Sequence, residues 1–336
     1  MKCFIRTILN VTVTLIISTN YYAMADANKT HKEFLSIIKN YKINAIAPAG
    51  FIDPEQLLSL RKIKNLHFNF PDRCYTTNSF LHAHNDDVRF ECLKDTLFDD
   101  STPIIWALRG GYGAAKLIPM LMEIKKPDKE KFFIGYSDLT ALHIFISQNW
   151  GWKTIHGDIL FALNKENHSP ENFIKLAKII TGRTTKAKIN NLKAMNDAAI
   201  AAKTISGKIT GGNLTIVQTS IGTDWQIQTK DKILFLEDIS LHPHMIDRAL
   251  LQLKQAKLLD NVKAIIFGEF IEEKAEKSNL VKRTLTEFAQ SVQIPCFTSN
   301  RFGHFANNDP LVYNTPSVVS KDSTNGYSLV MDLLAQ

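Results

Sequence analysis

The stretch FFIGYSDLTALH, residues 132–143, passes from an apolar run typical of a β-strand, through Gly-Tyr-Ser-Asp, into an apolar run with helical spacing. A serine at such a corner exposes its hydroxyl, and a neighbouring backbone N–H can face a developing oxyanion. Ser137 is therefore a candidate nucleophile, although Ser137 or Asp138 could instead simply cap the helix. Leu139 stands where a G-x-S-x-G elbow has its second glycine, so the α/β-hydrolase fold is not supported.

Short apolar runs alternate with helix-like segments on both sides of this corner. The run KINAIAPAG (42–50) precedes DPEQLLSLRKI (53–63), and similar runs follow as far as residue 149. This alternation predicts an α/β fold in which a doubly wound, mostly parallel sheet is covered on both faces. Ligands of such sheets gather beyond the carboxyl ends of the strands, where Ser137 is expected.

A chain of 336 residues is more than twice the length of a typical domain, so we expect two cores. Its 45% hydrophobic and 22% charged residues indicate a soluble globular protein. The pattern becomes polar and rich in Lys and Ala before residue 205. We therefore predict an N-terminal α/β domain over 26–185, a linker over 186–205, and a smaller C-terminal α/β domain over 206–336.

The N-terminus has the three regions of a secretory signal peptide. A basic start precedes the apolar run ILNVTVTLIIS, and Ala23-Met24-Ala25 gives the small-x-small cleavage pattern. The run is too short for a bilayer, which needs about 20 residues; a buried helix or an uncleaved anchor are the alternatives. We expect residues 1–25 to be removed and the protein to be exported to the periplasm, without stable membrane insertion.

Charge and cysteine content argue against several classes of site. The net charge of +7 is mild for this length, and Lys and Arg are scattered, so a nucleic-acid partner is not expected. Neither C-x-x-C nor H-E-x-x-H occurs, so we predict no metal and no cofactor. Cys74 and Cys92 could pair in an oxidising compartment, or they and Cys296 could be buried free thiols.

Other strand ends carry further candidates. The glycines of WALRGGYGAAK (106–116) could turn main-chain N–H groups towards an anion, or form only a tight turn; no complete phosphate-loop motif is present. Glu237 and His304 end two later strand-like runs, and an unpaired charge buried there would be costly. With Ser137 they supply nucleophile, base and orienter, although Glu237 could pair with Arg248 and His304 could be structural.

Other histidines compete for the role of base. His156, in TIHGD, follows a β-like run and is the stronger competitor. His143 lies nearly two helical turns after Ser137, about 9 Å away, which is too far for proton transfer. His242 and His244 flank a proline and are expected in a surface turn.

Six blocks occur in one order, within a match that covers about residues 40 to 315. They are ALRGGYGAAKLIPML, FIGYSDLTALH, GGNLTIVQTSIGT, ILFLEDIS, IDRALLQL and RFGH. Together they closely resemble the LD-carboxypeptidase family of serine peptidases, which includes murein tetrapeptide carboxypeptidases and microcin C immunity peptidases. The resemblance implies a metal-free catalytic triad of Ser137, Glu237 and His304, and an oxyanion hole formed by the N–H groups of Gly111 and Asp138. It also implies a homodimer.

The family's substrate class is a muropeptide or peptidoglycan stem peptide, cleaved between an L-centre such as that of meso-diaminopimelate and a terminal D-alanine. A serine amidase acting on peptidyl-nucleotides or other toxic amides, and a non-catalytic muropeptide-binding module, are the alternatives. Two segments depart from the family pattern: HGDI (156–159) replaces the usual His-Gly-Pro, and FANNDPLVYNTP follows His304. Arg109 could clamp a carboxylate, but we expect it in a buried ion pair.

Overall fold

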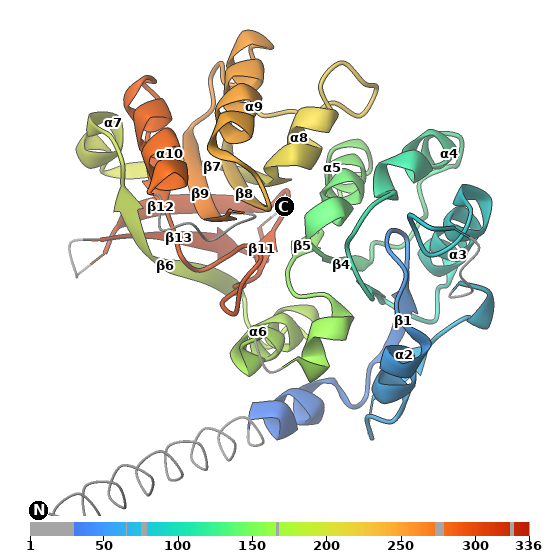
Figure 1. Ribbon diagram of the computed structural model, residues 1–336. Coiled ribbons are helices and arrows are strands. Elements are labelled where there is room, and N and C mark those ends of the chain that lie inside the picture. The colour runs from blue at the N-terminus through green and yellow to red at the C-terminus, as the bar shows by residue number, and fades with distance from the viewer. Residues whose placement is uncertain are drawn as a thin grey trace, which may run out of the picture.

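Two α/β lobes lie side by side in the computed structural model, one built on an open sheet and the other on a closed barrel (Figure 1). The structure describes residues 30–64, 66–74, 79–165, 168–272, 279–322 and 326–335. The predicted signal peptide, residues 1–25, lies outside the described residues. Of the helices in the described part of the chain, none combines the length and apolar character that a membrane span requires.

The first lobe contains a six-stranded sheet in the order β11-β5-β4-β3-β1-β2. Its pairs are parallel except that between β5 and β11, which is antiparallel and brings a strand from near the C-terminus into this lobe. The predicted α/β fold with a mostly parallel sheet is therefore confirmed. The strands are β1 (Lys42–Ile46), β2 (His67–Asn69), β3 (Ile104–Ala107), β4 (Phe132–Gly135), β5 (Ile155–His156) and β11 (Leu311–Val312).

Helices cover both faces of this sheet because alternate strand side chains, mostly apolar, point to opposite sides. Ile104 and Ile134 pack with the helix at 30–38, α2 and α6, whereas Ile105 and Phe133 pack with α3, α4 and α5. The helices are α2 (Pro54–Arg61), α3 (Asp86–Phe98), α4 (Ile118–Met122), α5 (Thr140–Asn149) and α6 (Pro170–Ile180). Single 3₁₀ turns are η1 (Asp72–Cys74), η2 (Ala114–Leu117), η3 (Ser137–Leu139) and η4 (Leu160–Asn164).

The second lobe is a closed barrel in the order β10-β6-β13-β12-β7-β8-β9. The structure differs from the sequence prediction here, because residues 186–194 are strand β6 rather than linker. Ile189 and Leu192 point into the core while most other side chains of the strand face solvent, which explains its polar composition. The strands are β6 (Lys186–Ala194), β7 (Thr204–Asn213), β8 (Lys232–Ile239), β9 (Ala264–Ile271), β10 (Cys296–Thr298), β12 (Pro316–Lys321) and β13 (Tyr327–Asp332).

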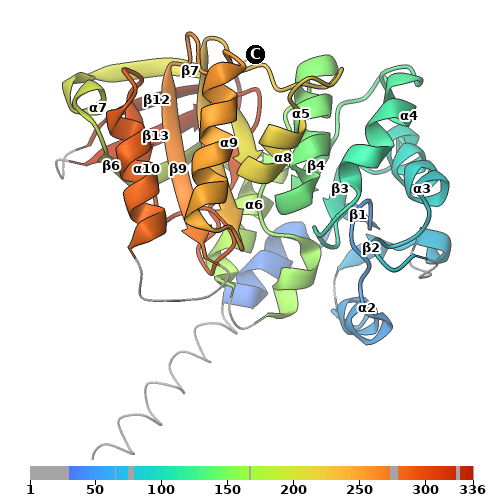
Figure 2. The same ribbon diagram turned by 45° about the horizontal axis from the view of Figure 1, so that its top comes forward.

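Helices cover the outside of the barrel along its parallel strands. Phe235 of β8 points into the barrel, whereas its neighbours Leu234 and Leu236 pack outwards against the helices. Helix α8 lies beside α5 of the first lobe in both views (Figures 1 and 2). The helices are α7 (Asp197–Ala201), α8 (Leu214–Thr219), α9 (Pro243–Gln255) and α10 (Leu280–Gln290).

Residues 299–310, hereafter the His304 loop, run from barrel strand β10 to β11 in the sheet of the first lobe. Leu311 of β11 pairs antiparallel with His156 of β5, so the loop reaches the carboxyl end of β5. Strand β4 lies parallel to β5, and Ser137 follows its carboxyl end. The strand order therefore brings His304 and Ser137 to the same edge of the sheet.

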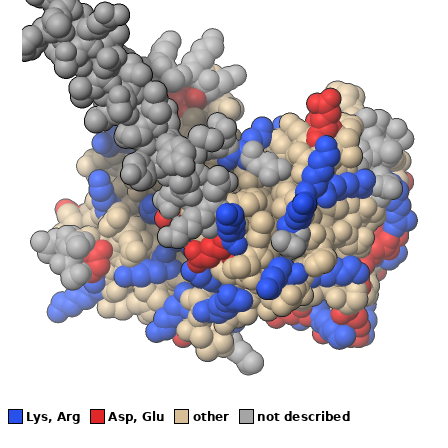
Figure 3. Space-filling model, turned by 90° about the horizontal axis from the view of Figure 1, so that it is seen from below, with Lys and Arg blue, Asp and Glu red and all other residues tan. Residues whose placement is uncertain are grey.

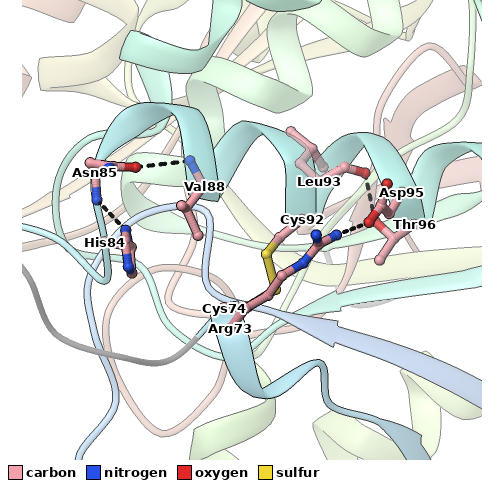
Figure 4. The surroundings of a disulfide bond; sticks show 9 residues. All are labelled: Arg73, Cys74, His84, Asn85, Val88, Cys92, Leu93, Asp95 and Thr96. Atoms are coloured by element: carbon pink, nitrogen blue, oxygen red, sulfur yellow. Dashed lines mark hydrogen bonds and ion pairs between the residues drawn. A yellow bond between two sulfur atoms is a disulfide. The ribbon is translucent and has the colours of Figure 1, made fainter.

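A disulfide joins Cys74 in η1 to Cys92 in α3, closing a segment in which the two cysteines are 18 positions apart (Figure 4). The sequence left open whether Cys74 and Cys92 form a disulfide or stay free thiols, and the structure contains the disulfide. Cys296 is a buried free thiol, and burial raises its pKa to about 12. Figure 3 shows Lys and Arg side chains on one face interspersed with Asp, Glu and uncharged residues. The expectation of no nucleic-acid partner stays a prediction.

Candidate active site

The chain turns sharply at Ser137, between β4 and α5. Ser137 has φ of 68°, a left-handed conformation that is unusual for a residue with a side chain. Before it, the strand ends at Gly135, where an added Cβ would lie 2.2 Å from Leu139 Cδ1. The corner thus requires both a strained serine and a residue without a side chain. Asp138 does not act as a cap, and Ser137 remains half-buried rather than enclosed.

The glycine-rich turn after β3 packs directly on this corner. A Cβ added at Gly110 would lie 2.9 Å from Ser137 Cβ. Gly111 has φ of 112°, and a Cβ there would lie 3.1 Å from Gly50 Cα, while Gly50 N–H donates to the Gly110 carbonyl at 2.8 Å. Glycine is needed at both positions, so main-chain atoms rather than side chains line this approach to Ser137.

The Asp138 side chain ties the two turns together. Its buried carboxylate accepts a hydrogen bond from Ala114 N–H at 2.8 Å, at the end of the glycine-rich turn. Burial raises the pKa of Asp138 to about 6, against the opposing effects of the Ala114 hydrogen bond and the Arg89 charge. Buried Arg89 also donates to the Gly113 carbonyl at 2.9 Å. Sequence reasoning missed this side-chain role; an acid directly after the candidate nucleophile was the available signal.

Glu237 and His304 form a short hydrogen bond, with His304 Nδ1 donating to Glu237 Oε2 at 2.6 Å. Glu237 is fully buried on β8, and its neighbour Asp238 is buried as well, beside a register shift between Leu236 and Asp238. Burial opposes both charges, but the ionic attraction prevails: the pKa of Glu237 lies below its usual value and that of His304 above. Glu237 thus pairs with His304 rather than Arg248.

The two halves of the site meet at Tyr136. Its ring centroid lies 4.8 Å from that of His304, and Tyr136 directly precedes Ser137. The lobes also touch where Asn213 N–H donates to Thr140 Oγ1 at 3.0 Å, beside Gly212, where a Cβ would lie 2.5 Å from that oxygen. Among the described residues no hydrogen bond joins Ser137 Oγ to His304; such bonds are often long in unliganded enzymes.

The competing histidines are placed differently. His156 is fully buried, and its ring packs against Tyr136 and Phe235; burial lowers its pKa to about 4, so it is neutral at pH 7. His143 donates from Nε2 to the Gly135 carbonyl at 2.9 Å, and burial lowers its pKa to about 3. His304 is thus the histidine that bonds to the buried acid.

Three further expectations concern the surroundings. Arg109 is exposed, and its guanidinium donates to the Phe51 carbonyl at 3.4 Å. No carboxylate of the described residues pairs with it, so the predicted buried ion pair is wrong. His242 is half-buried and His244 exposed, and their ring centroids lie 5.7 Å apart where α9 begins. In the ranges that the structure covers, no group of three or more His, Cys, Asp or Glu could hold a metal ion.

Known proteins are similar to this chain in both sequence and fold. The LD-carboxypeptidase N-terminal domain matches residues 43–157, and the LD-carboxypeptidase C-terminal domain matches residues 206–319. A Rickettsia conorii protein, named as a candidate carboxypeptidase, is 51% identical over 296 residues, covering 88% of this chain and 92% of its own. The murein tetrapeptide carboxypeptidase of Pseudomonas aeruginosa is 26% identical over 289 residues, covering 83% and 92%.

A solved structure shows the same fold. The muramoyltetrapeptide carboxypeptidase of Oxalobacter formigenes superposes with a TM-score of 0.71 at 23% identity, covering 86% of this chain and 98% of its own. The two family domains occur in the expected order and together span most of the chain. One relative is identical to this chain at half of the aligned positions. The chain belongs to the LD-carboxypeptidase family.

Proposed function

We propose that this protein is a serine-type murein tetrapeptide LD-carboxypeptidase, which releases the terminal D-alanine from the L-centre of meso-diaminopimelate in a stem peptide. The observation that carries the proposal is the 2.6 Å bond between His304 and buried Glu237, beside the strained turn at Ser137. Family membership supports the reaction class, and the relative in Pseudomonas aeruginosa is named for the tetrapeptide substrate.

In the proposed mechanism His304 works through its two ring nitrogens. Nδ1–H donates to Glu237, which leaves Nε2 unprotonated and able to take the proton from Ser137 Oγ. The oxygen then attacks the carbonyl carbon of diaminopimelate. Glu237 stabilises the imidazolium that forms, as the opposite pKa shifts of the pair favour. His304 next protonates the leaving amine of D-alanine, and water hydrolyses the acyl-enzyme by the reverse sequence.

The oxyanion would be bound by main-chain groups. Gly111 N–H and Asp138 N–H are the proposed donors, because the two turns that carry them are joined by the Asp138 carboxylate and packed through Gly110. One such donor contributes about 2.7–4 kcal/mol of transition-state stabilisation. The donors need no cofactor, and neither do the proton transfers, since both are made by groups of this chain.

We propose that the enzyme acts outside the cytoplasm, on the cell wall or on released muropeptides. The signal-like N-terminus motivates this, and the Cys74–Cys92 disulfide supports it, because disulfides persist in oxidising compartments. N-terminal sequencing of the protein from a periplasmic fraction should find Asp26 as the first residue. Recovery of a chain that still begins at Met1 would contradict export with cleavage.

The deciding experiment is product analysis by mass spectrometry on a defined tetrapeptide that ends in diaminopimelyl-D-alanine. The native enzyme should release free D-alanine and leave the tripeptide, whereas Ser137→Ala should release none. Equal release by both would reject the serine mechanism. Binding of the tetrapeptide without turnover would favour a non-catalytic module. Cleavage of a peptidyl-nucleotide amide in preference to the tetrapeptide would favour the toxic-amide alternative.

A further inference from the structure

We propose that Asp158 is a positioning residue for His304: with Asn308 it holds the His304 loop against the first lobe. The inference rests on the proposed function only in taking His304 as the base. Asp158 follows β5, is fully buried, and lies at the carboxyl edge of the sheet to which the loop is delivered. It makes no hydrogen bond to Glu237 or His304, so its hydrogen-bonded connection to the base runs through the loop.

The contacts of Asp158 account for its burial. Its carboxylate accepts from Asn308 Nδ2 at 3.0 Å and from Asn172 Nδ2 at 2.9 Å. His168 Nδ1 lies 3.3 Å from the same oxygen that accepts from Asn308. Two amides and an imidazole thus converge on one buried acid, from the start of α6 and from the His304 loop. A buried carboxylate is tolerated when it is satisfied in this way, and the donors are in turn fixed by it.

Asn308 carries the restraint to the residue next to His304. Its Nδ2 donates to Asp158, and its Oδ1 accepts from Gly303 N–H at 3.2 Å. Gly303 has φ of 131°, and a Cβ there would lie 3.2 Å from Glu269 Cβ, so the backbone is already enclosed on the barrel side. The start of the loop therefore lies between Asp158 of the first lobe and Glu269 of the barrel, and His304 is the residue directly after Gly303.

The rest of the loop is held from the same side. The Ala306 carbonyl accepts from Ser169 N–H at 2.9 Å and from Asn172 Nδ2 at 2.9 Å. Asn172 therefore bonds to Asp158 and to the loop at once. Asp309 pairs with Lys175 of α6 and with Arg301 of the loop itself. The half-buried histidine thus sits on a loop whose polar anchors come mostly from the first lobe, the lobe that carries Ser137.

The two departures from the family pattern prove to be parts of one contact. Asp158 stands in HGDI where His-Gly-Pro is usual, and Asn308 stands in the altered segment after His304. A proline at 158 would have no side-chain acceptor for Asn308 Nδ2, which would then be buried without this bond. The two altered residues are a hydrogen-bond acceptor and donor for each other, and together they hold the His304 loop.

The test uses the full-length protein with Asp158→Asn, Asn308→Asp and the double exchange. Asn308→Asp places two carboxylates face to face, and Asp158→Asn leaves one acceptor oxygen at position 158 for two amide donors, those of Asn308 and Asn172. The double exchange restores the pair: the amide then at position 158 can donate to the carboxylate at position 308, which can still accept from Gly303 N–H. Asn196→Ala is the matched control, since Asn196 is a buried amide bonded to Ala289 and Ile294 carbonyls at 2.8 Å, beside α7 on the far side of the barrel (Figure 1).

Three quantities are measured for each variant: kcat and KM for D-alanine release, and the rate at which a fluorophosphonate reagent labels Ser137. The labelling rate reports activation of the nucleophile for any substrate. We expect each single change to lower kcat and labelling about 10- to 100-fold, since small displacements of a reacting group have effects of this size, with KM within about twofold. The double exchange should recover most of the loss. Asn196→Ala should lower Tm while kcat stays near the native value.

Native rates in both single variants, or a double exchange no better than the worse single, would overturn the inference. A loss of kcat that tracks Tm across all variants, the control included, would also overturn it, because the network would then be merely structural. Labelling without D-alanine release by the native enzyme would reject the proposed substrate, yet the labelling rates would still decide the role of Asp158. Native protein that neither labels nor releases D-alanine would reject both proposals.

Discussion

The serine side and the histidine side of the site are held in different ways. Ser137 is fixed by backbone: a left-handed φ of 68°, and glycines at 110 and 111 that leave no room for a side chain. His304 is fixed by side chains, through buried Glu237 on the barrel and the contact between Asp158 and Asn308 to the other lobe. The first arrangement is local in sequence and steric, whereas the second joins segments up to 150 positions apart and is polar.

The largest loss of activity should come from a change on the histidine side. Glu237→Gln keeps the shape of the side chain but removes the charge that stabilises the His304 cation and selects its tautomer. We expect kcat to fall about ten-thousandfold. Steady-state kinetics on the tetrapeptide measure this, and near-UV circular dichroism checks that the fold is retained. A fall of less than tenfold in a folded variant would mean that the acid does not work through His304.

The serine side, which is held sterically, is tested by Gly111→Ala. The added Cβ would lie 3.1 Å from Gly50 Cα at a φ of 112° that alanine avoids, so the turn must shift and carry its N–H away from the oxyanion. We expect kcat to fall about 100- to 1,000-fold, the loss typical of one oxyanion donor.

Gly182→Ala provides the matched control for this change. Gly182 also has a positive φ, 66°, but an added Cβ there would meet nothing within 4 Å. The control should therefore cost about 1 kcal/mol or more of unfolding free energy through backbone strain and leave kcat unchanged. Equal losses of kcat in the two variants would show that strain alone, rather than the position of the Gly111 N–H, accounts for the result.

The histidine side is also the half that should set the pH dependence. His304 must be neutral to accept a proton, and the charge of Glu237, opposed by burial, raises its pKa above the usual 6.5. The protonated, inactive form therefore persists to higher pH, and kcat/KM should rise with pH through a midpoint above 6.5. Below that midpoint the rate should fall about tenfold per pH unit.

Asp138, with a pKa near 6, is the group on the serine side that could be mistaken for this base. Asp138→Asn removes its titration while keeping an oxygen that can accept from Ala114. If His304 controls the acid limb, the midpoint of the profile should remain where it is in the native enzyme. A midpoint that disappears or moves in Asp138→Asn would assign the limb to the serine side instead.

The same contrast explains what the sequence could predict. The corner at Ser137 and the glycine-rich turn are local, so their residue order alone pointed to a strand, a turn and a helix. The barrel was not predicted: Lys186–Ala194 looks like a polar linker because most of its side chains face solvent, and only pairing with β10 and β13 makes it a strand. Likewise β11, two residues long, joins the first sheet through long-range pairing that no local pattern announces.

The contact between Asp158 and Asn308 was visible only as two unexplained departures from a family pattern. Neither residue shows by its spacing that it faces the other, because barrel strands β6 to β10 lie between them in the sequence. Arg109 illustrates the opposite error. A buried ion pair was expected there, but the side chain lies at the surface and donates to the Phe51 carbonyl.

The smallest effect on activity should come from the disulfide, which braces the serine side from a distance. The bridge holds Cys92 of α3 (Figure 4). Arg89 of the same helix bonds to the Gly113 carbonyl, so the bridge steadies the helix behind the glycine-rich turn. Arg89 keeps its own contacts when the bridge is absent, and Cys74→Ser/Cys92→Ser should therefore change kcat by no more than about twofold. The cost should instead be about 3 kcal/mol of unfolding free energy, because a loop of this length is no longer closed in the unfolded chain.

Urea unfolding with and without dithiothreitol separates this cost from other effects of the substitutions. Reductant should bring the native protein down to the stability of the double variant and leave the double variant unchanged, while Cys296→Ala should remain as sensitive to reductant as the native chain. Insensitivity of the native protein would mean that the bridge is not formed in solution. A loss of kcat as large as that of Gly111→Ala would mean that the serine side depends on a distant covalent brace and not on the local shape of its backbone.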